Sequence, residues 1–188
     1  MLKGACTGLR AVEKSDLEQL LRWRNQPEFR KFFREYRELN MTQQHIWYET
    51  SCLKDDHTIM FSIVELPTMR LLGAAGLCRI NWIDRNADFS IYIGADGVYI
   101  DSRFAPDAGR TLIRYAFEEL CLHRLWAEIY SIDDAKQILL PSLGFSMEGR
   151  HRGTHWTEGR WVDSLFFSLL EDDYHRTNDT QQATSDKG

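Results

Sequence analysis

Histidine and cysteine side chains are the first candidates for metal or thiol chemistry. His151 and His155 are spaced i, i+4, but they fall on a predicted strand, where this spacing separates them by about 13 Å, too far to share a metal ion. The four cysteines form no CxxC pair, which fits neither a zinc knuckle nor a disulfide framework. The sequence therefore predicts no metal site, and reduced thiols in a cytoplasmic protein.

The segment from Ile100 to Arg110 contains residues suited to binding an anion. Arg103 and Arg110 can make charge-assisted contacts to phosphate, and Pro106 is well placed at the start of a helix. The unpaired amides at a helix N-terminus attract anions, although Asp107 in the same turn would oppose one. The alternative is an ordinary surface loop with two solvated arginines.

The composition limits the classes of protein that this chain can belong to. Its 188 residues are 43% hydrophobic and 12% aromatic, enough for one substantial core. A formal charge of -5 gives no basic face for a nucleic acid. No signal-peptide stretch and no run of about 18 apolar residues occurs, so we expect neither export nor membrane binding. We expect one domain over residues 1–174 and a polar, disordered tail over 175–188.

These residues must be positioned by alternating strands and helices. Ser15 and Glu18 suggest a capping box that starts a helix, which Pro27 should end near Asn25. Thr42 is a plausible N-cap of a second helix. Apolar runs and turn residues then predict further strands at 58–65, 71–80, 88–94, 125–130, 146–156 and 160–170, with helices at 106–122 and 133–140. The fold class is α/β, of the α+β type.

Three strings and this element order resemble the GNAT superfamily of N-acetyltransferases over residues 8–174. YAFEELCLHRLWAEI, from Tyr115 to Ile129, is similar to the helix-to-strand passage of the branch with ribosomal-protein and amino-sugar acetyltransferases. The stretch from Leu143 to Leu170 is similar to its closing hairpin, and Trp23-Arg24-Asn25 to the amino-terminal half of enzymes that acetylate nucleotide-linked amino sugars, including the flagellin-sugar pathway enzyme. The resemblance implies a mixed, splayed sheet of about seven strands flanked by about four helices.

The resemblance also implies acetyl-CoA as co-substrate. Backbone groups of Ile91, Tyr92 and Ile93 on the splayed strand would pair with the pantetheine arm. The family's glycine pattern for the pyrophosphate is incomplete here, and two frames remain open, one with Ala105 at the final small position and one with Gly109. The residues implied to bind the coenzyme are completed by Arg103, Ala108, Arg110 and Asp133.

For catalysis, Asp88 occupies the position where this branch often has a glutamate, and it is the candidate base. The alternative is that Asp88 merely pairs with Arg85 or Arg79 at a strand end. The family's general-acid tyrosine is replaced by Leu140. Because a thiolate with a pKa near 8.5 is a tolerable leaving group, turnover does not require that acid, and Tyr130, Ser131 or water could substitute.

The acceptor is expected to be a small-molecule primary amine, most consistently that of a nucleotide-linked amino sugar, attacked without a covalent enzyme intermediate. A protein N-terminus or a small polyamine is the nearest alternative acceptor, and a non-catalytic acyl-CoA sensing domain is the alternative of another class. We expect a monomer or homodimer. The residues expected to border the acceptor are Arg24, Asn25, His45, Arg79 and Asn81.

Overall fold

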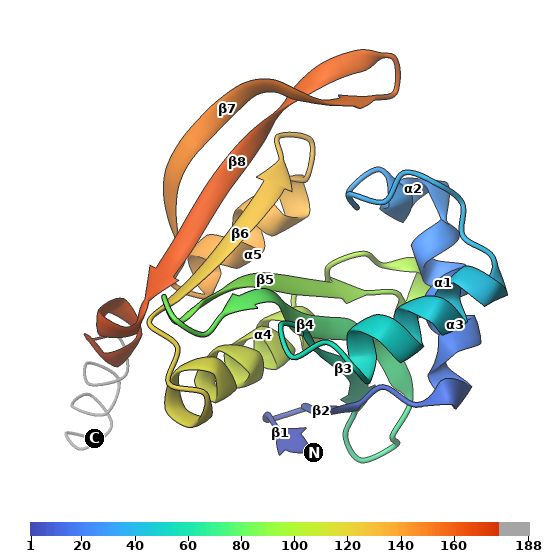
Figure 1. Ribbon diagram of the computed structural model, residues 1–188, viewed down its shortest axis with the longest axis horizontal. Helices are drawn as coiled ribbons and strands as arrows, with labels where there is room; N and C mark the ends of the chain where they lie inside the picture. The colour runs from blue at the N-terminus through green and yellow to red at the C-terminus, as the bar shows by residue number, and fades with distance from the viewer. Residues whose placement is uncertain (177–188) are drawn as a thin grey trace.

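The computed structural model describes residues 1–176 and places all eight of their strands in one sheet (Figure 1). The order is β1-β2-β3-β4-β5-β6-β8-β7, and every neighbouring pair is antiparallel except β5 and β6. The mixed sheet is thus confirmed, with the short β1 added. The strands are β1 (Leu2–Lys3), β2 (Thr7–Ala11), β3 (Ile59–Glu65), β4 (Leu71–Asn81), β5 (Asn86–Ile93), β6 (Arg124–Tyr130), β7 (Ser146–Thr157) and β8 (Arg160–Leu170).

Helices precede β3 and follow β5 and β6 (Figure 1). The α-helices before β7 are α1 (Leu17–Asn25), α2 (Pro27–Arg30), α3 (Met41–Trp47), α4 (Phe104–Arg114) and α5 (Asp134–Ser142). Residues 171–176 are also helical, and the polar tail predicted from residue 175 lies otherwise outside the described residues. No helix within 1–176 combines the length and apolarity needed to cross a bilayer.

The first helix is fixed by a different cap from the one predicted. Glu13 and Asp16, rather than Ser15 and Glu18, form the capping box, ahead of a short 3-10 turn. Asp16 is held in this position because it is buried and its carboxylate accepts hydrogen bonds from Arg10 Nη1, at 2.6 Å, and from Ser62 Oγ, at 2.7 Å. These bonds attach the start of α1 to β2 and β3. The predicted end at Asn25 before Pro27 is confirmed.

The second helix also starts earlier than predicted, because Asn40 and not Thr42 is its N-cap. The Asn40 side chain accepts a hydrogen bond from the Gln43 amide at 3.0 Å, and the Gln43 side chain accepts one from the Asn40 amide at 2.9 Å. Two reciprocal bonds satisfy two helix-end groups at once. This cap sets the rotation of α3 and thereby buries Gln44 and Tyr48 instead of Ile46.

Helix α4 packs against β2, β4 and β5 and is attached to the chain's first residues by Asp107. The carboxylate of Asp107 accepts hydrogen bonds from the amides of Ala5, Cys6 and Thr7 at 2.9 to 3.0 Å, and from the Thr7 hydroxyl at 2.6 Å. Burial raises the pKa of Asp107, but these bonds outweigh it and bring the pKa to about 2. The Asp107 carboxylate therefore stabilises the fold by attaching α4 to the N-terminal segment.

The closing hairpin of β7 and β8 extends beyond the rest of the sheet (Figure 1). Its turn uses Glu158 at φ 49° and Gly159 at φ 76°. Two successive positive φ values are typical of the tight turn whose twist matches a right-twisted hairpin. The predicted hairpin across Thr157-Glu158-Gly159 is therefore confirmed.

Candidate active site

A fork between β5 and β6 forms the centre of the site. The two strands pair in parallel only from Asn86 with Arg124 to Asp88 with Trp126, and then diverge (Figure 1). A cavity of about 490 Å³ fills the fork beyond that point. Its walls include side chains from both strands, from β4, from α5 and from the loop between α2 and α3. The sheet itself therefore supplies an opening beside a buried strand.

The edge of β5 that faces the fork has no strand partner past Asp88. The Ile93 amide donates to the Tyr99 carbonyl at 2.8 Å, on the side away from β4. Because the direction of backbone groups alternates along a strand, Ile91 also directs its amide into the fork, whereas Tyr92 faces β4, opposite Ala74. Of the three residues predicted to contact the coenzyme, only Ile91 has a backbone edge that is open to the fork. The Ile93 amide is bonded to the Tyr99 carbonyl, and the backbone of Tyr92 points to β4.

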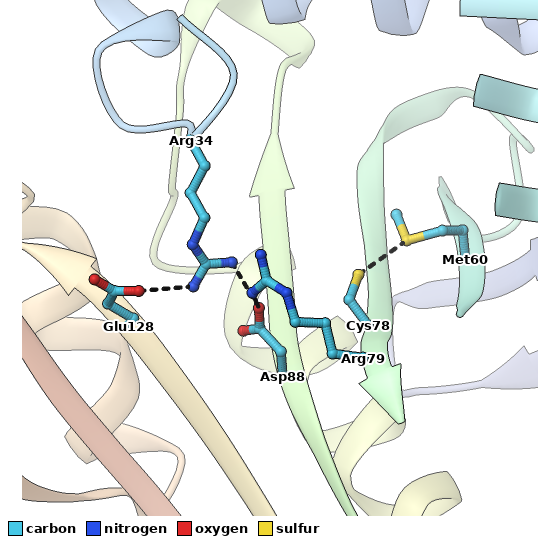
Figure 2. Close-up of polar contacts among 6 residues, drawn as sticks. All are labelled: Arg34, Met60, Cys78, Arg79, Asp88 and Glu128. Atoms are coloured by element: carbon cyan, nitrogen blue, oxygen red, sulfur yellow. Dashed lines mark hydrogen bonds and ion pairs between the residues drawn. The ribbon is translucent and has the colours of Figure 1, made fainter. Parts of the chain in front are cut away.

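Asp88 lies at the base of the fork and binds two arginines (Figure 2). Its Oδ2 accepts a hydrogen bond from Arg34 Nη1 at 2.6 Å and another from Arg79 Nη1 at 2.8 Å. Arg34 also reaches Glu128 Oε2 on β6 at 3.3 Å and so bridges the two arms of the fork. The pairing with Arg79 that the sequence left open is present, and Arg34 is added to it.

The buried environment of Asp88 makes this carboxylate a better proton acceptor than a carboxylate on the protein surface. Asp88 is only 4% exposed, and burial raises its pKa, against the opposing effect of Arg34 and Arg79. Both arginines bind Oδ2, whereas Oδ1 has no hydrogen bond to another residue within 1–176, and Asp88 lines the cavity. A carboxylate with one anchored oxygen and one unengaged oxygen is suited to take a proton from a bound group.

The local backbone explains how Arg79 reaches Asp88. The pairing of β4 with β5 shifts register between Cys78 and Asn81, and Arg79 adopts φ 51° there. An irregularity of this kind redirects one side chain relative to a regular strand. The side chain of Arg79 consequently turns to the Asp88 carboxylate, while Cys78 lies against Met60 (Figure 2).

A second cavity of about 410 Å³ lies between α1, α3 and the sheet. Arg24 lines both cavities, and its guanidinium stacks over the Phe33 ring at 4.9 Å. Within residues 1–176 it has no hydrogen bond or ion pair. Glu35 and Arg37 in the same cavity pair with each other at 2.8 Å, which lowers the pKa of Glu35 to about 2. Arg24 is thus an unpaired cation where the two cavities meet.

The other residues predicted to border the acceptor lie outside both cavities. Asn25 holds the α2–α3 loop, because its side chain donates to the Leu39 carbonyl and accepts from the Leu39 amide. Asn81 shapes the turn after β4 by accepting from the amides of Ile83 and Asp84. His45 is exposed on α3 and does not line either cavity. Of the five residues predicted to border the acceptor, Arg24 and Arg79 therefore line the cavities, and the other three do not.

The predicted pyrophosphate site at the start of α4 is filled by a carboxylate of the chain. Asp101 accepts hydrogen bonds from the amides of Arg103, Phe104 and Ala105 at 2.7 to 3.3 Å. These are the amides that a phosphate would use at a helix N-terminus. The open edge of β5 thus fits the pantetheine arm, whereas the first turn of α4 fits a pyrophosphate only after Asp101 moves away.

The two frames for the glycine pattern have different positions in α4. Ala105 lies in the first turn of α4 and contributes one of the amides there. Gly109 lies in the middle of the helix, where a Cβ atom would come within 2.7 Å of a methyl group of Leu143. Ala108 is fully buried. The placement favours the Ala105 frame and gives Gly109 a packing role. Arg103 stacks on Phe104, and Arg110 lines a separate cavity beside the N-terminal segment.

Asp133 connects the start of α5 to Tyr99, which lies in the segment after β5. It caps α5 by accepting from the Lys136 amide at 3.0 Å, and its other oxygen accepts from the Tyr99 hydroxyl at 3.1 Å. Asp133 is 1% exposed, and burial raises its pKa. Both oxygens of its carboxylate accept hydrogen bonds from within the chain, and Asp133 does not line the fork cavity, so the structure gives it a structural role.

Sequence reasoning missed several charged groups that line the fork. They come from three separate segments and follow no motif spacing: Arg34 with Glu35, Glu128, and Lys136. Only the run of charges after Phe32 and Phe33 could have drawn attention to Arg34. In the described part of the chain, no group of three or more His, Cys, Asp or Glu side chains is arranged to hold a metal ion.

Comparison with known proteins agrees with this geometry. The chain is 27% identical over 168 residues to an uncharacterized N-acetyltransferase, p20, of Bacillus licheniformis, covering 88% of this chain and 93% of that protein. It is 30% identical to a putative ribosomal N-acetyltransferase of Bacillus subtilis over 54% of each chain. The solved Vibrio cholerae spermidine N-acetyltransferase, in complex with CoA and spermine, has a TM-score of 0.82 at 24% identity and is covered over 97% of its length, with 89% of this chain.

The family profile described as Acetyltransferase (GNAT) domain matches residues 7–146, which include α1, the fork and α5. This match covers the open edge of β5, Asp88 and the first turn of α4. The chain therefore belongs to the GNAT acetyltransferases and is an acetyl-CoA-dependent N-acetyltransferase.

Proposed function

We propose that this enzyme acetylates a primary amine that also carries an anionic group, as a nucleotide-linked amino sugar does. The observation that carries the proposal is the unpaired guanidinium of Arg24 at the junction of the two cavities. Arginine binds phosphate and carboxylate groups through two parallel hydrogen bonds. A phosphate next to Arg24 would leave the amine of the same molecule free to extend toward Asp88.

The charge of the two cavities supports an anionic acceptor over a polyamine. Their walls contain five cationic side chains, Arg24, Arg34, Arg37, Arg79 and Lys136, against three carboxylates, Glu35, Asp88 and Glu128. Each of the three carboxylates is already bonded to an arginine. A polycation such as spermine, which the solved Vibrio protein binds, needs carboxylates that are free to pair with it.

The proposed reaction is direct attack of the neutral amine on the acetyl carbon of acetyl-CoA. The open edge of β5 at Ile91 supplies backbone hydrogen bonds to the coenzyme's arm, and a backbone amide there polarises the thioester carbonyl. The unengaged Oδ1 of Asp88 accepts the proton that the amine loses, directly or through one water. Arg34 and Arg79 hold the carboxylate in place for this transfer.

Acetyl transfer to a matched panel of amines tests the proposal. The panel contains a nucleotide-linked amino sugar, the same amino sugar without its nucleotide, spermidine, and a peptide with a free N-terminus. We expect the nucleotide-linked amine to have the highest kcat/KM, since a charge-assisted contact is worth about 1.5 to 3 kcal/mol. Preference for spermidine or for the peptide would contradict an anionic acceptor.

Replacement of Arg24 separates binding of the acceptor from chemistry. Arg24→Met should raise the KM of the nucleotide-linked amine by about 10- to 100-fold and leave that of the unlinked sugar within about twofold. Arg22→Met is the matched control, because Arg22 lies on the same helix but is exposed and pairs with Glu18. Equal effects of Arg24→Met on both sugars would remove the basis for the anionic acceptor.

A further inference from the structure

Lys136 places an unpaired cation in the fork. This residue lies in the first turn of α5, is half-buried, and lines the cavity that also contains Asp88. Its ammonium has no hydrogen bond or ion pair within residues 1–176. Asp133, the N-cap of the same helix, uses one oxygen for the Lys136 amide and the other for the Tyr99 hydroxyl. The ammonium instead lies 5.4 Å from the centre of the Tyr99 ring.

An ammonium withdrawn from water without a partner is costly, so its position calls for a ligand that offsets the cost. Burial lowers the pKa of Lys136, partly opposed by Asp133 and Asp88 and reinforced by Arg34. The charged and titratable groups that share this cavity or adjoin the lysine from the surrounding elements are Arg24, Arg34, Glu35, Cys78, Arg79, Asp88, Tyr99, Glu128, Tyr130 and Asp133. The carboxylates among them are bonded to other groups, and none of them forms a direct ion pair with the Lys136 ammonium, so an anion bound in this cavity could contact it.

Leu140, which lies beside Lys136 in the cavity, helps to identify the anion that Lys136 would bind. It lies one turn after Lys136 on α5, lines the same cavity, and has no polar atom with which to assist a leaving thiolate. Helix residues four apart lie on one face, so Lys136 and Leu140 face the fork together. The reaction creates one anion in this cavity, the sulfur of the departing coenzyme.

We propose that Lys136 is the group that stabilises and protonates the thiolate released from acetyl-CoA. The inference rests on the acetyl transfer proposed above. The amine lone pair forms the new C–N bond, the C–S bond breaks, and its electron pair stays on sulfur. One proton passes from the Lys136 ammonium to that sulfur, while the proton lost by the nitrogen goes to Asp88. Solvent then returns a proton to Lys136 and takes one from Asp88, so the products are the amide and the free thiol.

The first test measures the bound thiol and needs no turnover. CoA bound to the protein is titrated with pH while the ultraviolet absorbance of the thiolate is followed, and protein saturated with acetyl-CoA supplies the baseline for the chain's own cysteines. We expect the bound thiol to titrate at least about one pH unit below free CoA, because a nearby cation favours the thiolate. In Lys136→Met the midpoint should return to that of free CoA. A bound thiol that titrates like free CoA in the unaltered protein would overturn the proposal.

The second test separates the charge of Lys136 from its proton. Lys136→Met should lower kcat about 100-fold with the dissociation constant of acetyl-CoA unchanged within about twofold. Lys136→Arg should keep the lowered thiol midpoint and still lose turnover at pH 8, because a guanidinium does not release a proton there. Lys54→Met, an exposed lysine outside the cavity, is the control.

The outcomes distinguish this inference from the proposed function. Full kcat in Lys136→Met, with Tyr130→Phe strongly impaired, would assign the acid to Tyr130 and overturn the role of Lys136. Acetylation of no amine by the unaltered protein, with acetyl-CoA bound and the thiol midpoint lowered, would contradict the proposed acceptor and leave the thiolate contact of Lys136 standing. Failure to bind acetyl-CoA in calorimetry would contradict both.

Discussion

The outer edge of β5 and the first turn of α4 would bind the two ends of one coenzyme. The strand edge is open at Ile91, whereas the amides of the helix turn are already bonded to a carboxylate of the chain. Past Asp88 the edge of β5 faces a cavity with no paired strand, so a ligand can pair at Ile91 without breaking a described contact, although the Ile93 amide is bonded to the Tyr99 carbonyl. The first turn of α4 has its amides bound by Asp101, and its Asp107 carries the attachment of the N-terminal segment. We therefore infer that the strand mainly supports chemistry and that the helix mainly supports stability.

The largest expected effect is on the strand side, at Asp88. Asp88→Asn keeps the shape of the side chain but removes the base, so kcat should fall about 100-fold or more. Because burial raises the pKa of Asp88, the acidic limb of kcat/KM in the unaltered enzyme should lie above the usual aspartate value of about 3.9. Steady-state kinetics over a range of pH measures both quantities.

Asp84→Asn, in the exposed turn after β4, is the control for this substitution. Thermal unfolding of both variants shows whether the loss of charge between Arg34 and Arg79 has disturbed the fold. If a folded Asp88→Asn enzyme retained kcat within about threefold, Asp88 would serve only to pair the two arginines, and the strand would lose its chemical role.

The sequence predicted the strand side better than the helix side, for a physical reason. Strand periodicity places Asp88 and Ile91 by local rules, and these hold because the sheet buries alternate residues. On the helix side, the bond from the Ala5 amide to Asp107 joins residues that are 102 positions apart, and no local pattern encodes a contact of that kind. The bonds from the Phe104 and Ala105 amides to Asp101 are local, and they lie within the segment that the sequence offered for a phosphate.

The cavity charges escaped prediction for a related reason. Arg34 reaches Asp88 from an irregular loop, and Arg79 reaches it through a register shift and a positive φ. Lys136 has an ordinary helical position, and only the fork beside α5 makes it unusual. His45 illustrates the opposite error, because the cap at Asn40 fixes a rotation of α3 that turns this residue to solvent. The chemistry was predictable by type, but the side chains that meet in the cavity were not.

The helix side should show its main effect in stability, at Asp107. Its folded pKa of about 2 lies below the unfolded value of about 3.9. A depressed folded pKa contributes stability that is present above pH 4 and lost as the pH falls toward 2. The difference corresponds to about 2 kcal/mol in the free energy of unfolding.

Asp107→Asn should therefore lose about 2 kcal/mol at pH 7 and have a flatter dependence of stability on pH between 4 and 2. Urea unfolding at a series of pH values provides the measurement, with the exposed Asp56→Asn as control. Parallel pH profiles for the two proteins would show that the bonds from Asp107 to the N-terminal segment do not stabilise the fold. The helix would then be as free for ligand binding as the strand.

The smallest expected effect is at Asp101, where stability and coenzyme binding oppose each other. Removal of a capping carboxylate in Asp101→Ala should cost about 1 kcal/mol of stability. It also frees the amides of Phe104 and Ala105 and removes a negative charge next to the incoming pyrophosphate. An interaction of about 0.3 to 1 kcal/mol at a helix terminus corresponds to roughly two- to fivefold tighter binding of CoA.

Calorimetric titration with CoA and with S-acetylpantetheine separates the two ends of the coenzyme. The second ligand lacks the pyrophosphate, so its affinity should be the same for Asp101→Ala and for the unaltered protein, and only CoA should gain. Tighter binding of both ligands would place the effect in the fork and not at α4. Weaker binding of CoA would mean that the Asp101 carboxylate holds the loop in the shape that the coenzyme needs, and the contrast between an open strand edge and a closed helix turn would no longer hold.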